Sequence, residues 1–217
     1  MSAFTQRLSP GLNAQIRQYG GIILAIAALI LLFSLTSERF LRVDNFLNIA
    51  QQIAVISVAA FGMTFVIMLG EIDLSVGSMI AVSGMVAAQA LTHGIALFPA
   101  MLLALAAGMV MGALNGVLVA KGRLPSFIVT LATMGIFRGV CSLPTDGLPQ
   151  GIENETWLNL SDEALLGVPV LVWIMLLLFA ISTLIQRFSI YGRRAYLTGG
   201  NAEAAAYSGL RVTSVRI

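Results

Sequence analysis

The sequence is poor in the residues on which soluble enzymes depend. Only 10% of its 217 residues are charged, and it has one lysine, one histidine and one cysteine. A phosphate-binding loop requires Gly-Lys-Ser/Thr, but Lys121 is followed by Gly122, so this chain does not hydrolyse ATP itself. A single histidine, His93, leaves no paired metal ligands and no Ser/His dyad, which argues against an intramembrane enzyme. Cys141 has no partner for an internal disulfide.

The sequence contains long runs of uncharged, mostly apolar residues. Hydrophobic residues make up 58% of the chain, and the mean hydropathy is +0.92. A membrane-spanning helix needs about 20 mostly apolar residues. We therefore predict an all-α, polytopic membrane protein with about six transmembrane helices. The expected spans are 20–36, 45–69, two within 74–120, one that Pro125 opens, and 165–185.

The stretch from Leu74 to Ala120 contains no formal charge. As one helix it would be about 70 Å long, roughly twice what a bilayer requires. It must therefore fold back, and the turn is expected at Thr92-His93-Gly94, with Pro99 in the first turns of the following helix.

Clusters of positive charge predict the topology, because cytoplasmic loops of membrane proteins carry the excess of Lys and Arg. We predict a cytoplasmic N-terminus over 1–18, a transmembrane domain over 19–186 and a cytoplasmic segment over 187–217. Such clustering reports orientation and gives no indication of nucleic-acid binding. The clusters are Arg7 with Arg17, Lys121 with Arg123, and Arg187 with Arg193 and Arg194.

Two carboxylates interrupt the apolar region within the stretch 70–78, Gly-Glu-Ile-Asp-Leu-Ser-Val-Gly-Ser. We predict that a helix stops here, that a short extended bridge follows, and that a helix then restarts. Gly70 suits the left-handed end of the first helix, and Asp73 or Ser75 is expected to cap the second. The first candidate site therefore consists of Gly70, Glu71, Asp73, Ser75 and, at the far end of the stretch, Gly77.

The bridge alternates polar and apolar residues. In an extended chain, Glu71, Asp73 and Ser75 would lie on one side, and the apolar residues between them on the other.

A face of small residues is expected on the fourth span. Gly108, Gly112 and Gly116 recur every four residues, which lets another helix approach closely. Asn115 lies beside this face, where we expect it to make an interhelical hydrogen bond.

A second candidate site lies in the cytoplasmic segment, where 201–209 are predicted to form a short helix that docks onto a partner. Asn201 is a good N-cap, Glu203 complements the helix dipole, and Gly209 stands where a C-terminal glycine belongs. Ala204 and Ala205 belong to a three-alanine run that would offer a smooth surface to a groove on another protein.

The sequence resembles bacterial sugar ABC-transporter permeases of the ribose, xylose and arabinose type. The resemblance covers nearly all of 40–217 and does not identify the sugar. It is carried by Gly62-Met63-Thr64, by 72–78, by Ala120-Lys121-Gly122-Arg123 with 125–131, by Arg138-Gly139, and by Gly199-Gly200-Asn201 leading through Ala204-Ala205 to Ser208-Gly209.

Membership of this family would imply a subunit of the bacterial inner membrane. Its partners would be a second permease subunit, a cytoplasmic ATP-hydrolysing subunit and a periplasmic sugar-binding protein. The region from Gly200 to Gly209 would be the coupling segment that contacts the ATPase. Two features depart from the family pattern: position 71 is Glu where many members have Gly, and members continue through further membrane helices beyond the coupling segment. We therefore expect this chain to represent only part of such a permease.

A secondary transporter is the alternative, in which Glu71 and Asp73 would carry protons or bind a cation. The predicted docking helix distinguishes the two, because a proton-coupled carrier has no need of one.

Overall fold

The computed structural model describes residues 10–162 and 164–217, and the chain divides into two compact units whose sequence boundary falls within helix α2. The first unit ends at Ala50, and the second comprises Gln51–Ile217. Half of the predicted N-terminal segment 1–18, Arg7 included, lies outside the described residues.

The first unit contains α1, Pro10–Thr36, and the first turns of α2, Val43–Met68. The apolar part of α1, Tyr19–Thr36, corresponds to the predicted first span. Around the connection between the helices, the ring of Phe40 lies 5.6 Å from that of Phe33 and 6.5 Å from that of Phe46.

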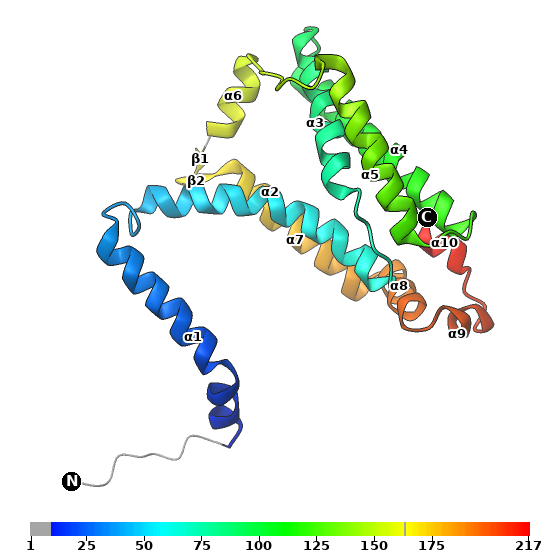
Figure 1. Ribbon diagram of the computed structural model, residues 1–217, viewed down its shortest axis with the longest axis horizontal. Coiled ribbons are helices and arrows are strands. Elements are labelled where there is room, and N and C mark those ends of the chain that lie inside the picture. Colours follow the sequence, from blue (N-terminus) through cyan, green and yellow to red (C-terminus); the bar gives the residue numbers. More distant parts are fainter. Residues whose placement is uncertain (1–9, 163) are drawn as a thin grey trace. The chain divides into compact units, whose positions relative to one another are not determined.

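The centre of the second unit is a group of three neighbouring helices (Figure 1): α3 (Val76–Thr92), α4 (Leu97–Ala120) and α5 (Ser126–Ser142). Val82, Met111 and Phe137 provide one buried side chain from each helix. The turn between α3 and α4 falls where the sequence predicts it, and Gly94 adopts a φ of +79° there. This left-handed conformation favours glycine.

The small-residue face of α4 makes the close contacts that its spacing predicts. A Cβ at Gly108 would lie 3.3 Å from Ser83 Oγ of α3, and one at Gly116 would lie 3.2 Å from the backbone of Ile217. The face therefore packs against α3 at one end and against the C-terminal residues at the other.

The segment after α5 differs from the prediction. It contains η1 (Leu143–Thr145), α6 (Glu155–Asp162), β1 (Ala164–Leu165), β2 (Val168–Pro169) and α7 (Val170–Phe188). The expectation that the last span begins at Leu165 is wrong, because this residue pairs with Val168 in a hairpin. Leu166 and Gly167 both have positive φ angles, 57° and 77°, as a two-residue hairpin turn requires.

Three short helices complete the chain: α8 (Ile190–Gly200), α9 (Ala202–Tyr207) and α10 (Val212–Arg216). Ala195 of α8 is fully buried with Val215 of α10 and Leu69, which follows α2. Helices α8 and α10 therefore pack against the end of α2.

The fold class is confirmed, but the number of long spans differs from the prediction. Five stretches within the described residues are long and apolar enough to cross a membrane: Tyr19–Thr36, α2, α4, Ser126–Thr145 and α7. The sixth, α3, has 17 residues, about 26 Å of helix. It is shorter than the hydrocarbon core of about 30 Å because its first residues unwind into the bridge.

Candidate functional site

The bridge is the segment 69–75 between α2 and α3. At its start, the Gly70 N–H donates to Ile67 O and the Glu71 N–H donates to Val66 O, at 2.9 and 3.1 Å. Gly70 has a φ of +74°. This pair of bonds around a left-handed glycine is a Schellman motif. The prediction that Gly70 ends the helix in the left-handed conformation is confirmed.

The start of α3 is organised by Asp73. Its Oδ1 accepts from the Ser75 N–H at 2.7 Å and from the Ser75 hydroxyl at 2.6 Å. We expected Asp73 or Ser75 to accept from a free N–H of α3, and this is wrong for both: the Ser75 side chain caps no helical N–H, and the two hydrogen bonds of Asp73 come from Ser75, the N-cap residue. Asp73 instead fixes the residue from which the helix starts. Gly77 lies within the first turn of α3 rather than at the end of the bridge.

The polar side of the bridge faces the interior of the protein. Glu71 and Asp73 are half-buried and Ser75 is fully buried, whereas Ile72 and Leu74 have exposed fractions of 53% and 36%. This is the arrangement that a lipid environment favours, because hydrocarbon offers polar groups no hydrogen bonds.

Asn115 supplies the expected interhelical hydrogen bond. Its Nδ2 donates to the Ser75 hydroxyl at 2.9 Å, and its side chain is buried. The sequence indicates such a bond but not its partner, which lies 40 residues away. Asn115 thus joins the helix face on α4 to the inward side of the bridge.

The first turns of α5 hold the middle of the bridge. The Ile72 N–H donates to Ser126 Oγ at 3.2 Å, and Thr130 Oγ1 donates to Ile72 O at 3.1 Å. Both backbone groups of Ile72 are therefore satisfied by side chains one helical turn apart. Sequence reasoning missed this role of Ser126 and Thr130, although both lie in the stretch 125–131 that resembles sugar permeases.

Glu71 has a charged partner. Arg216 Nε lies 3.0 Å from Glu71 Oε1, and the two side chains are 30% and 18% exposed. The Arg216 N–H is not directed at this oxygen in hydrogen-bond geometry, so the contact is primarily a charge interaction. The sequence gives no signal for this pair, because Glu71 and Arg216 lie far apart along the chain.

A glycine of α8 touches the end of α2 directly. A Cβ at Gly199 would collide with the backbone oxygen of Met68, and Gly199 O lies 3.6 Å from the position a Gly70 Cβ would take. Sequence reasoning missed α8 altogether. A local signal was present in Ser189, whose side chain accepts from the Gly192 N–H at 2.9 Å and caps the helix.

The predicted helix at 201–209 is present as α9. Asn201 Oδ1 accepts from the Ala204 N–H at 2.9 Å, and Gly209 has a φ of +84°, as its caps predict. The expectation that Ala205 belongs to an exposed docking surface is wrong, because this residue is only 5% exposed and belongs to the interior. Ala204 is exposed and lines a groove of about 320 Å³ formed by Tyr196, Leu197, Gly200, Asn201, Ala204, Ala205, Ser208 and Leu210.

A cavity of about 260 Å³ lies against the bridge. Its wall includes Glu71, Asp73 and Asn115, together with residues of α2, α5, α8 and α10. Within the described part of the chain, no group of three or more His, Cys, Asp or Glu side chains is arranged to hold a metal ion.

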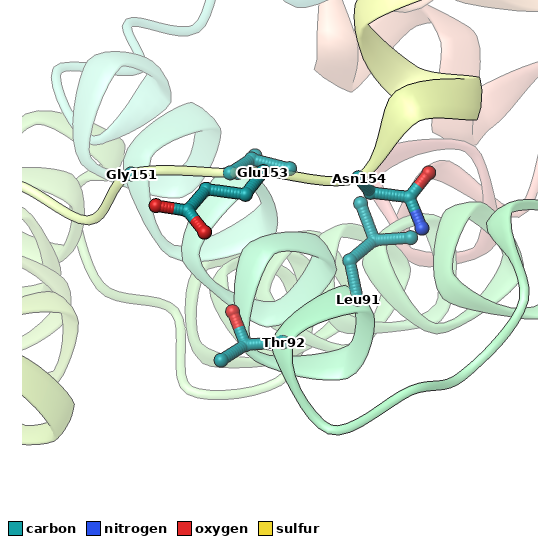
Figure 2. A pocket seen from close by; sticks show the side chains of 6 residues that line it. Leu91, Thr92, Gly151, Glu153 and Asn154 are labelled. Carbon is teal, nitrogen blue, oxygen red and sulfur yellow. The ribbon is translucent and has the colours of Figure 1, made fainter.

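A second cavity, of about 470 Å³, lies at the opposite end of α3. Figure 2 shows the extended segment with Gly151, Glu153 and Asn154 passing the helix end with Leu91 and Thr92. The segment is tethered through Gln150, which donates to Thr92 Oγ1 at 3.2 Å and accepts from Gln89 at 3.1 Å.

Comparison with known proteins identifies the family. Residues 45–217 match the family described as branched-chain amino acid transport system, permease component. The ribose import permease of Haemophilus influenzae is 37% identical over 89% of this chain, and that of Bacillus subtilis is 38% identical over 91%. The L-arabinose ABC transporter permease of Azospirillum brasilense is 33% identical over 94%.

The chain spans about three fifths of these relatives: 61%, 62% and 60% of their respective lengths. No solved structure has significant similarity to it. The secondary-transporter alternative is not favoured, because these relatives are import permeases, two of them for ribose and one an ABC permease by name. This multi-pass protein of the bacterial inner membrane belongs to the branched-chain amino acid transport system permease family and is a homologue of the ribose and arabinose import permeases.

Proposed function

We propose that this chain forms part of the membrane-spanning subunit of an ATP-driven importer that translocates a monosaccharide. The observation that carries the proposal is the similarity to ribose import permeases over about nine-tenths of the chain. Its partners would be a second permease subunit, a periplasmic sugar-binding protein and a cytoplasmic subunit that hydrolyses ATP.

The groove beside α9 is our proposed contact for the ATPase. Its exposed wall carries Gly200, Asn201 and Ala204, and the caps at both ends of α9 hold the segment in one conformation. In this arrangement Ala205 supports the groove from inside, and Gly209 fixes the point where α9 ends.

The bridge is our proposed link from this groove to the transmembrane helices. Gly199, beside the groove, contacts the end of α2, and Arg216 pairs with Glu71. On its other side the bridge is bonded to α5 through Ile72. A movement of α8 would therefore reach α3 and α5 through contacts that already exist.

Both bridge carboxylates are engaged within the protein, which supports a structural role over proton or cation coupling. Glu71 is paired with Arg216, and Asp73 accepts two hydrogen bonds from Ser75.

A matched pair of substitutions tests the docking role. Ala204 and Ala206 are both exposed on α9, but only Ala204 lines the groove. We expect Ala204→Arg to abolish co-purification of the cytoplasmic ATP-hydrolysing subunit, and Ala206→Arg to retain most of it. Membrane levels of both variants are measured as a control. Equal co-purification of the two variants would contradict docking in the groove.

A direct uptake assay tests the transport itself. The assembled transporter in proteoliposomes, supplied with the sugar-binding protein and ATP, is expected to accumulate radiolabelled D-ribose or L-arabinose. Accumulation that persists without ATP but follows an imposed pH gradient would favour the secondary-transporter mechanism instead.

A further inference from the structure

The connection between α1 and α2 is held in one conformation by contacts among its own residues. The Phe40 N–H donates to Ser37 O at 3.2 Å, and the Arg42 N–H donates to Arg39 O at the same distance. Asn45 Nδ2 donates to Phe40 O at 2.9 Å. The Phe40 ring also lies within 6.5 Å of two other phenylalanine rings. The side chains that this turn carries therefore start from a fixed backbone.

A cavity of about 300 Å³ lies against this turn. All the side chains that line it are charged or carry an amide: Arg39, Arg42, Asp44, Asn45 and Asn48. Its volume is many times the roughly 30 Å³ that one water occupies in the liquid. The cavity therefore has room for a polar group larger than a water molecule.

The two arginines of the wall have hydrogen-bond donors to spare. Within the described part of the chain, the Arg39 side chain has no hydrogen-bond or ion-pair partner. Arg42 Nη2 lies 3.4 Å from Asp44 Oδ2, with side chains that are 63% and 75% exposed, and such a surface pair contributes little. Each guanidinium has five N–H donors. Donors from both arginines are therefore available to an acceptor in the cavity.

The charges of the wall favour an anion. Two guanidinium groups outweigh the one carboxylate, that of Asp44, which lies in the first turn of α2 and is stabilised there by the helix dipole. Glu38 is adjacent in sequence but does not line the cavity. Guanidinium groups bind phosphate oxygens through paired N–H donors. The wall therefore fits a phosphate diester, which carries a single negative charge.

The surroundings of the cavity indicate where such a phosphate comes from. The turn joins two apolar stretches long enough to cross a membrane, Tyr19–Thr36 and Val43–Met68, so it lies at the depth of the lipid headgroups. Leu41 and Val43 flank Arg42 in the sequence and are 61% and 71% exposed. A phospholipid covers these apolar side chains and supplies the phosphate as well. A soluble phosphate would leave them in water.

We propose that this cavity binds the headgroup of an anionic phospholipid. The phosphodiester lies between Arg39 and Arg42. Hydroxyl groups of the headgroup bind to Asn48 and to the side-chain oxygen of Asn45, whose amide nitrogen already donates to Phe40 O. The bound lipid stabilises the connection between α1 and α2 at the membrane surface. This role is independent of the transported molecule and of the partner subunits.

Native mass spectrometry of the purified chain tests the site, because it counts individual bound lipids. The probes are phosphatidylglycerol and phosphatidylcholine with identical acyl chains, of which only the first has a net negative charge and headgroup hydroxyls. We expect one phosphatidylglycerol to bind about tenfold more tightly than phosphatidylcholine, as one additional charge-assisted hydrogen bond would give. Arg39→Gln should remove most of this preference. Arg138→Gln is the matched control, since Arg138 is also exposed on a membrane-span candidate but does not line the cavity.

A second variant leaves every charge in place. Asn48→Ala removes only an amide of the wall, at an exposed position where folding is little affected. It should weaken binding of phosphatidylglycerol severalfold and leave binding of phosphatidylcholine unchanged. An excess of inorganic phosphate should not displace the bound lipid, because it brings no apolar chains.

Three results would overturn the inference. Equal binding of the two lipids by the unmodified chain would mean that the cavity selects no anion. A preference for phosphatidylglycerol that persists in both Arg39→Gln and Asn48→Ala would place the lipid elsewhere. Displacement of the lipid by inorganic phosphate would assign the cavity to a soluble anion.

Discussion

Arg216 places its guanidinium 3.0 Å from the carboxylate of Glu71 and thereby joins α10 to the bridge between α2 and α3. Both side chains are partly exposed, and the geometry is that of a charge pair without a directed hydrogen bond. The structure thus supplies a partner for the charge that Glu71 brings into the bridge.

Removing either charge should destabilise the protein by a small amount. We expect Glu71→Gln and Arg216→Gln each to lower the free energy of unfolding, and the double variant to reveal a coupling of about 1 kcal/mol, as for a partly exposed pair. The measurement is unfolding of the purified protein in mixed micelles with increasing dodecyl sulfate. Strictly additive effects would show that the pair contributes nothing.

Gly199→Ala should be far more damaging than the same change one residue later. Its Cβ would collide with the Met68 backbone, which cannot move aside as a side chain can. Overpacking of this kind costs about 1–3 kcal/mol. Gly200→Ala is the control, since no atom lies within 4 Å of its Cβ position. Thermal stability and yield of the two variants should differ clearly. Similar values would mean that α8 does not press on α2.

Asp73 can be tested for charge and for hydrogen bonding separately. Asp73→Asn keeps an oxygen that accepts from Ser75, whereas Asp73→Ala removes it. We expect the alanine variant to lose about 0.5–2 kcal/mol of stability, the usual value of a capping interaction, and the asparagine variant much less. Uptake by the assembled transporter should survive Asp73→Asn. Loss of uptake at normal membrane levels would assign the charge itself a role.

The predicted topology can be checked with reporter fusions. Asp146 follows α5, and Tyr196 lies in α8, on the far side of α7. Alkaline phosphatase fused at Asp146 should be active, since the enzyme requires the periplasm, and a fusion at Tyr196 should be inactive. The same location for both positions would refute the predicted orientation.

Local chemistry was sufficient to predict much of this fold. A left-handed glycine at Gly70, the turn at Gly94 and the caps of α9 all depend on residues within a few positions of each other. The alternation along the bridge also predicts its two sides, because an extended chain directs successive side chains oppositely.

Contacts between distant segments could not be predicted in the same way. Thr130 and Ile72 are 58 residues apart, and neither position distinguishes this contact from many others. The burial of Ala205 depends on how α9 packs, which its helix-forming alanines do not specify. The hairpin at 164–169 was missed because Leu166 in a left-handed turn has no clear sequence signal.

The contact between Gly199 and the end of α2 has a mechanical consequence. Where side chains separate two helices, a change of rotamer can absorb part of a displacement of one helix before it reaches the other. Here Gly199 places main chain against main chain, with no side chain between them. A displacement of α8 towards α2 therefore moves the Met68 backbone directly, and the bridge that follows Met68 moves with it.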